Sequence, residues 1–177
     1  MDCNPELIAA AQNNTAKLGF SERFALHTGE LADARFLENL RMEASPVQLV
    51  MANPPWRLVG SGRLPATEAR RKALFGDKGT FPLFASAASS LLEEDGRFVC
   101  IISPDRLQDM LAALDGAGLT PYLLQYIHKQ KTSPATFVLI EARKGAHAKP
   151  SVAEPIALYG PECFFTLESL AFCPFLR

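Results

Sequence analysis

Apolar residues recur along this chain at two spacings, one typical of helices and one typical of strands. Runs at the helical spacing predict helices at 4–18, 31–42, 81–94 and 105–117. Alternating or continuous apolar runs bounded by turn residues predict strands at 24–27, 47–52, 98–102, 119–127 and 135–141. The proline-containing tail after Lys149 is expected to add a short strand near 156–159 and a helical turn near Leu167.

Strands that alternate with helices favour an α/β fold with a mostly parallel sheet and helices on both faces. The runs at 47–52 and 98–102 are apolar almost throughout, which is typical of buried strands. Only a polar link from His128 to Pro134 separates the last two strands, so we expect an antiparallel finish. We predict one domain over 1–177 that binds its ligands beyond the carboxyl ends of the strands.

The composition restricts the class of protein. A hydrophobic fraction of 48% with 21% charged residues is typical of a globular protein, and the formal net charge of -1 gives no overall attraction for nucleic acid. The cysteines lack the spacing of a zinc site, so we expect reduced, mostly buried thiols and no metal. Because the sequence shows neither a signal-peptide pattern nor a stretch of roughly 18 apolar residues, we expect a cytoplasmic protein without a membrane partner.

Asn53-Pro54-Pro55-Trp56, called here the Asn53–Trp56 motif, follows the strand at 47–52 and carries the most specific chemistry in the sequence. An exocyclic amino group on an aromatic ring is a poor nucleophile because its lone pair is delocalised into the ring. An Asn side-chain oxygen and a backbone carbonyl held by proline can accept both N–H hydrogens and localise that pair. The aromatic residue offers a stacking face for a base. The motif therefore predicts catalysis by orientation and hydrogen bonding, without a strong base.

The Asn53–Trp56 motif resembles the Asn-Pro-Pro-aromatic motif of class I S-adenosylmethionine-dependent amino methyltransferases, although Trp56 replaces the more usual Tyr or Phe. Segment 2–8 resembles the second cofactor motif of that Rossmann-like fold. The arginine-containing loop after the motif and segments 91–98 and 133–145 resemble the bacterial tRNA (valine) adenine-N6 methyltransferases. The resemblance covers most of the chain, and it implies S-adenosyl-L-methionine as cofactor and a tRNA as partner.

The same resemblance implies roles for single residues. Asp2 would hold the ribose hydroxyls of the cofactor, and Cys3 would lie against its adenine. Glu30 and Leu31 resemble the acidic–hydrophobic pair that contacts the cofactor's adenine, although an acidic residue after a strand is also a common helix cap. Asn53 would lie between cofactor and substrate.

The resemblance also places Met1 and Asp2 at the end of the second strand of the fold. A first strand, a glycine-rich loop and a first helix are therefore expected to be missing from these residues. Since the first strand is central in that fold, its absence would uncover backbone groups and apolar side chains beside the strand at 47–52. We expect a truncated chain that binds cofactor weakly or not at all.

A glycine- and arginine-rich loop is expected at 57–80. It contains six basic and two acidic residues, so its local net charge is +4. The candidate RNA-binding residues are Arg57, Arg63, Arg70, Arg71, Lys72 and Lys78. Directly after the motif, such a loop can clamp phosphates while a base flips into the site. The alternative is a charged loop in solvent. His128, Lys129 and Lys131 form a second, smaller basic group.

Other functions remain open from the sequence. A protein glutamine methyltransferase of the release-factor type uses the same motif on a planar carboxamide nitrogen, although a peptide substrate does not require the basic loop. An rRNA guanine-N2 methyltransferase is closely related chemically. A remnant that only binds RNA or a partner would fit the missing glycine-rich segment. We expect a monomer in each case.

Overall fold

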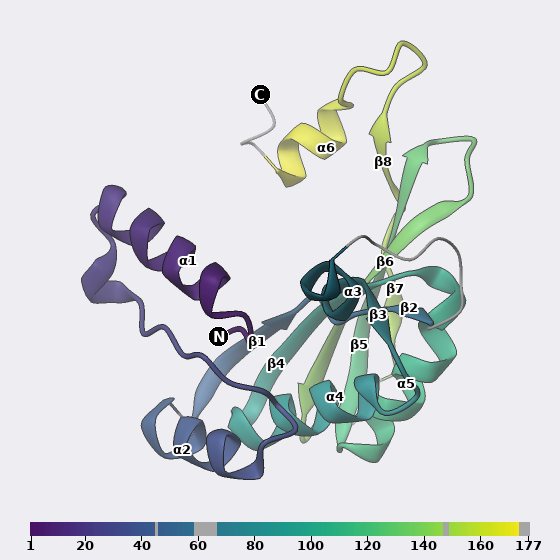
Figure 1. The fold of residues 1–177 in the computed structure, drawn as a ribbon. Helices are drawn as coiled ribbons and strands as arrows, with labels where there is room; N and C mark the ends of the chain where they lie inside the picture. Colours follow the sequence, from purple (N-terminus) through teal and green to yellow (C-terminus); the bar gives the residue numbers. More distant parts are fainter. Residues whose placement is uncertain (45, 59–66, 147–148, 174–177) are drawn as a thin grey trace. The chain divides into compact units, whose positions relative to one another are not determined.

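The computed structural model describes residues 1–177 except 45, 59–66, 147–148 and 174–177. The chain divides into two compact units, Met1–Ala44 and Ser45–Arg177. The first unit contains helices, and the second contains a six-stranded sheet with helices along it (Figure 1). The described part of the chain has no helix that is both long enough and apolar enough to span a membrane.

Side-chain caps begin both α-helices of the first unit. Its elements are α1 (Pro5–Lys17), the 3-10 helix η1 (Ser21–Arg23) and α2 (Ala34–Ala44). The Asn4 side chain accepts the N–H of Glu6 at 2.9 Å, and the Asp33 carboxylate accepts the N–H of Arg35 at 2.9 Å. The helix predicted at 4–18 is confirmed, and the one expected at 31–42 begins at Ala34, after the Asp33 cap.

The strand predicted at 24–27 is not formed. The chain instead makes one parallel bridge, between Asp2 and Thr28. The Asp2 N–H donates to the His27 carbonyl at 3.2 Å, and the Gly29 N–H donates to the Asp2 carbonyl at 3.1 Å. A strand needs a partner along its length, and the parallel pairing described here is limited to this bridge. The bridge nevertheless places Asp2 beside the residues that lead into Glu30.

The strands of the main sheet in the second unit are β1 (Val47–Ala52), β4 (Leu92–Ile102), β5 (Leu119–Gln130), β6 (Ala135–Lys144), β7 (Ser151–Val152) and β8 (Ile156–Tyr159). Their order in the sheet is β1-β4-β6-β5-β7, and β8 also pairs with β5. Pairing is parallel between β1 and β4 and between β5 and both β7 and β8, whereas β6 is antiparallel to both of its neighbours. The predicted mostly parallel sheet with an antiparallel strand near its end is therefore confirmed.

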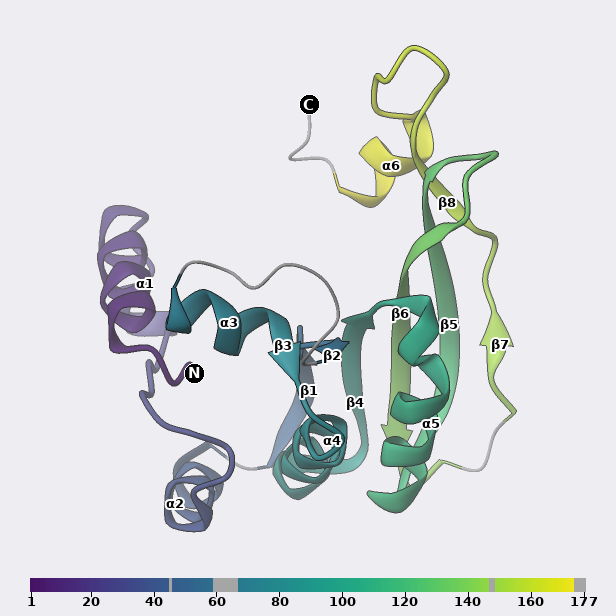
Figure 2. The same ribbon diagram turned by 45° about the vertical axis from the view of Figure 1, so that its right-hand side comes forward.

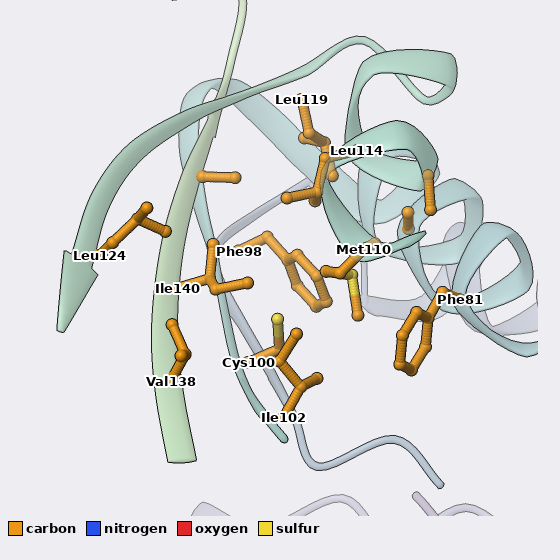
Figure 3. Packing of buried hydrophobic residues seen from close by; sticks show 14 of the residues in the cluster. Phe81, Phe98, Cys100, Ile102, Met110, Leu114, Leu119, Leu124, Val138 and Ile140 are labelled. Carbon is orange, nitrogen blue, oxygen red and sulfur yellow. The ribbon is translucent and has the colours of Figure 1, made fainter. Parts of the chain in front are cut away.

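The core lies between one face of this sheet and two helices, α4 (Thr80–Leu91) and α5 (Leu107–Gly116), which contact each other along the sheet (Figure 2). Alternate residues of β4 point into it, namely Phe98, Cys100 and Ile102, and β6 adds Val138 and Ile140 (Figure 3). The alternation is that of a strand with one face buried. The helix predicted at 81–94 ends earlier, because β4 already begins at Leu92.

β1 is not the buried strand that its apolar run predicted. It pairs with β4 alone among the described strands, so it forms an edge of the sheet. Leu49 is 42% exposed and Met51 is 72% exposed. An apolar run predicts a strand from its composition but does not reveal how many neighbours cover it, which is decided by the assembled sheet.

The stretch 57–80 is not a loop throughout. Within its described part lie β2 (Arg57–Leu58), α3 (Glu68–Leu74) and β3 (Phe75–Gly76). β2 and β3 pair in parallel, Arg57 with Phe75 and Leu58 with Gly76. The Thr67 side chain caps α3 by accepting the N–H of Arg70. Charged residues obscured this helix in the sequence, because its seven residues provide too little apolar periodicity to reveal a face.

The segment after Lys149 pairs with β5 through β7 and β8. The predicted strand near 156–159 is β8, and the predicted turn is α6 (Leu167–Phe172), which the Thr166 side chain caps through the Ser169 N–H at 3.0 Å. β7 was not predicted. All four cysteines are free thiols, but the expectation that most are buried was wrong. Only Cys100 is buried, because it alone occupies the inner face of a central strand.

Candidate active site

The Asn53–Trp56 motif leaves the sheet at the carboxyl end of β1. Pro54 is fully buried and Asn53 is exposed, while Pro55 and Trp56 are half-buried. Two consecutive prolines fix φ at 54 and 55, so the path of the backbone after Asn53 is restricted before any tertiary contact forms. The turn therefore presents an amide side chain at the end of the strand and anchors its own backbone in the core.

An open pocket of about 260 Å³ lies beside Asn53. It is lined by Met51, Ala52, Asn53, Val99, Cys100, Ile101 and Leu139. Its walls are apolar, and its volume falls just below the roughly 300–1,000 Å³ typical of small-molecule sites. Burial raises the pKa of the Cys100 thiol to about 12, so this group stays protonated at neutral pH and is not a nucleophile. Asn53 is thus the polar side chain of this pocket.

The Trp56 ring is held by neighbours on two elements. The Phe137 ring of β6 meets it edge-on, with ring centres 6.2 Å apart and planes at 73°. The guanidinium carbon of Arg57 lies 5.2 Å from the centre of the indole ring, in cation–π contact. An aromatic side chain with a cation over it is suited to an electron-rich, negatively charged ligand such as a nucleotide.

Two residues that the sequence did not single out hold the backbone of the motif. The Arg106 side chain donates from Nη1 to the Trp56 carbonyl at 2.8 Å. A Cβ on Gly76 would lie 2.6 Å from the Pro55 carbonyl oxygen, so only glycine lets β3 approach the turn this closely. Neither residue has a local sequence signal, since each acts on a partner many positions away.

The predicted RNA-binding residues are partly brought together. Arg57 follows the motif directly, and Arg70, Arg71 and Lys72 are exposed on α3, which leads into β3 and is thereby tied to β2. Lys78 is exposed in the turn before α4. Arg71 pairs with Glu68 at 3.5 Å, which offsets part of the positive charge. Arg63 lies outside the described residues.

The predicted cofactor residues of the first unit lie on two segments that one bridge joins. The Asp2–Thr28 bridge brings Asp2 and Cys3 close to the segment that continues into Glu30 and Leu31. The Asp2 carboxylate is half-buried and accepts the Asn4 N–H through Oδ1 at 2.8 Å, which orients it at the start of α1. Phe36 packs so tightly on Gly29 that a Cβ there would lie 2.3 Å from its ring. Asn53 belongs to the second unit.

No group of three or more His, Cys, Asp or Glu side chains within the described residues is arranged to hold a metal ion. The polar groups at the motif are instead amide and carbonyl oxygens, which accept hydrogen bonds but do not take up protons at neutral pH.

Comparison with known protein families gives no matching family model, and comparison with curated proteins gives no match either. Comparison with solved structures does give matches. A predicted O-methyltransferase from Agrobacterium tumefaciens superposes with a TM-score of 0.70 at 20% identity, over 98% of this chain and 73% of that one. An O-methyltransferase family 2 protein from Planctomyces limnophilus, solved with apigenin, gives a TM-score of 0.51 at 16% identity, over 81% of this chain and 41% of that one.

These likenesses establish the fold. The chain has the Rossmann-like α/β architecture of these methyltransferases, as its sequence predicted. It spans about three quarters of the first neighbour's length and less than half of the second's.

Proposed function

We propose that this chain is an S-adenosylmethionine-dependent N-methyltransferase, or the larger part of one, that acts on adenine N6 of a tRNA. The observation that carries the proposal is the Asn53–Trp56 motif at the carboxyl end of β1, with an exposed amide, a buried Pro54 and a cation over the Trp56 ring. Carboxyl ends of parallel strands are where α/β folds of this kind bind nucleotides.

The residues of the motif suit an amino acceptor. The Asn53 side-chain oxygen and a backbone carbonyl of the proline turn would each accept one N–H of the adenine amino group, which localises the nitrogen lone pair. These two acceptors would hold the amino nitrogen with its lone pair directed at the methyl group that a bound sulfonium cofactor would supply, and the proton released by the nitrogen would pass to solvent. Both acceptors bind more strongly as positive charge develops on nitrogen, so they lower the barrier selectively.

The names of the structural neighbours favour a second candidate, transfer to oxygen. A phenolic or alcoholic acceptor must lose its proton before or during attack, which calls for a group that can take it up. The motif offers an amide and carbonyls, which cannot. We therefore rank nitrogen above oxygen as the acceptor.

The residues of the first unit suit the cofactor, whose contribution when bound is a methyl group activated by a sulfonium. Asp2 is oriented through Oδ1 by the Asn4 N–H, and its Oδ2 would accept a ribose hydroxyl. Cys3, Glu30 and Leu31 lie near the same bridge and would surround an adenine. Hydrogen bonds from a carboxylate to a vicinal diol are the usual way in which nucleotide-binding sheets hold a ribose.

The basic residues support an RNA over a peptide as the substrate. The Arg57 guanidinium lies over the Trp56 ring, and Arg57 belongs to β2, which pairs with β3. The cations of α3, which precedes β3, and Lys78, which follows it, are exposed. Phosphate contacts of this kind would position the strand while a base enters the site. A protein glutamine or an rRNA guanine as acceptor, or binding without catalysis, are the alternatives. We also propose that the protein acts as a cytoplasmic monomer.

The test is methyl transfer from radiolabelled cofactor to a set of tRNA transcripts. Asn53→Ala is expected to lower turnover by about 100-fold or more, as removal of a hydrogen-bonding group from a catalytic site does elsewhere. Asn13→Ala, at an exposed position of α1, is the matched control and should leave turnover unchanged. Retained turnover in a folded Asn53→Ala protein would contradict the mechanism.

The substrate is tested separately. Replacing Arg70, Arg71 and Lys72 together by Ser should weaken tRNA binding and reduce its dependence on salt concentration by a slope of about 3. Methylation of a release-factor peptide but of no RNA would instead support the glutamine alternative. Binding of RNA without binding of cofactor or turnover would support the remnant.

A further inference from the structure

Arg106 is a buried charge that the proposed chemistry does not use. It ends the 3-10 helix η2 (Pro104–Arg106), directly before α5, and is only 4% exposed. Taking a guanidinium out of water is costly, so a buried arginine is retained only where its donors and charge are compensated. The contacts of Arg106 therefore indicate what this residue does.

Three of its contacts are with described residues. Nε donates to Asp109 Oδ2 at 2.7 Å, and the guanidinium carbon lies 4.6 Å from the centre of the Phe81 ring on α4. Nη1 donates to the backbone carbonyl of Trp56 at 2.8 Å, fifty residues away in the sequence. The bond to Asp109 compensates the charge within its own helical region, and the ring of Phe81 orients the guanidinium from α4. The third reaches across to the Asn53–Trp56 motif.

The topology explains how this contact arises. β1 and β4 are parallel neighbours, so their carboxyl ends lie at the same edge of the sheet. The motif leaves β1 at that edge, and η2 leaves β4 there. Arg106 therefore connects two adjacent strand ends with one hydrogen bond from a charged donor, which is stronger than a bond between neutral groups.

The motif needs such a contact at its last residue. The prolines fix φ at 54 and 55, but nothing in the covalent structure fixes the backbone at Trp56. Among the described residues that follow Trp56, the two residues of β2 pair with β3. The Trp56 ring itself packs against the core cluster and contacts Phe137 and Arg57, whereas its backbone carbonyl is held by Arg106.

We propose that Arg106 is a positioning residue, which fixes the backbone of Trp56 and thereby the orientation of its ring toward the substrate base. The consequence for catalysis rests on the function proposed above, whereas the fixing of Trp56 does not. Arg106 does not touch the reacting atoms. It acts through Trp56, so its loss should affect the orientation of the bound base more than the strength of binding.

Trp56 is the only tryptophan of the chain, so its fluorescence reports on this site alone. We expect Arg106→Met to shift the Trp56 emission to longer wavelength and to raise its quenching by acrylamide, because the released turn exposes the ring to water. Arg106→Lys keeps the charge but lacks the planar fork that serves both partners, so its emission should fall between wild type and Arg106→Met.

Two controls separate positioning from general stability. Arg143→Met removes another arginine that pairs with a carboxylate and lies over a ring, with Glu141 at 2.9 Å and Tyr122 at 3.6 Å, and it should leave the Trp56 emission unchanged. Asp109→Asn removes the negative charge of the Nε partner and leaves the bond to the Trp56 carbonyl possible. It should change the emission much less than Arg106→Met does. Circular dichroism and thermal melting show which variants are folded.

The outcomes decide both proposals. Unchanged Trp56 emission in folded Arg106→Met overturns the positioning role. So does failure of both Arg106 variants to fold beside a folded Arg143→Met, since Arg106 would then serve the core. With turnover established, Arg106→Met should lower kcat by about tenfold with little change in KM for the tRNA, and Arg106→Lys should recover part of it. A changed emission without any turnover by the wild type would leave the positioning role intact and count against methyl transfer by this chain on its own.

Discussion

The two faces of the sheet in the second unit are made by neighbouring residues of the same strands, yet they differ in burial. On one face, Phe98, Cys100 and Ile102 of β4 are covered by α4 and α5 and are almost inaccessible to water. On the other, Val99 and Ile101 are half-buried and line open pockets. Within the described part of this unit, the Phe172 side chain of α6 lines the pocket on the second face near β5.

This difference shows that apolar residues on both faces of a strand do not guarantee two buried faces. The outward residues are as apolar as those of a covered sheet, but burial depends on which elements pack there. The Asn53–Trp56 motif starts at this boundary, since Met51 and Asn53 lie along the open face while Pro54 is fully buried. The motif is therefore anchored by the covered side of the sheet and open on the other.

The largest expected effect comes from a matched pair on β6. Ile140 is fully buried among the core residues, and its neighbour Leu139 lines both open pockets. Ile140→Ala should lower the free energy of unfolding by about 3–4 kcal/mol, because it removes packed methylene groups and leaves a cavity. Leu139→Ala should cost about 1 kcal/mol, as it removes only half-buried surface. Urea unfolding of both variants measures the difference, and equal losses would mean that the second face is covered in solution.

An intermediate effect is expected from Cys100, the thiol of the covered face. Burial raises its pKa from 9.0 to about 12, so between these values the unfolded chain loses a proton that the folded chain keeps. The free energy of unfolding should therefore fall as pH rises above about 9, by up to about 1.4 kcal/mol per pH unit from this group.

The stability difference between wild type and Cys100→Ala should accordingly shrink as pH rises from 8 to 10.5. Urea unfolding at several pH values measures it. Val138→Ala, which truncates a buried core residue without a titrating group, is the control and should show a constant difference. A constant difference for Cys100→Ala as well would indicate that water reaches the covered face.

The smallest effect is expected at the open edge. Met51→Lys places a charge on a residue that is 72% exposed on β1, so it should change the free energy of unfolding by no more than about 0.5 kcal/mol. A charge on an edge strand also opposes strand pairing between molecules, so sedimentation at high protein concentration should show less association. A loss of stability as large as that of Ile140→Ala would place Met51 in a buried contact.

The predictability of the fold varied with the length and periodicity of each element. The helix after Asn4 and the strand pair at 119–127 and 135–141 have strong periodicity and clear boundaries, and the structure contains them. The strand predicted at 24–27 was wrong, because a run of four residues cannot reveal whether a partner lies along it. The helix Glu68–Leu74 was missed, because exposed charges dominate its sequence.

The sequence by itself determined the α/β order of elements and the chemistry of the Asn53–Trp56 motif. Both follow from local rules, since periodicity selects helix or strand and consecutive prolines fix a turn whatever surrounds it. The tertiary structure decided which face of the sheet is covered, that β1 lies at an edge, and that Arg106 and Gly76 hold the turn. These features depend on contacts between residues far apart in the chain, and such contacts leave no local pattern that a single sequence can reveal.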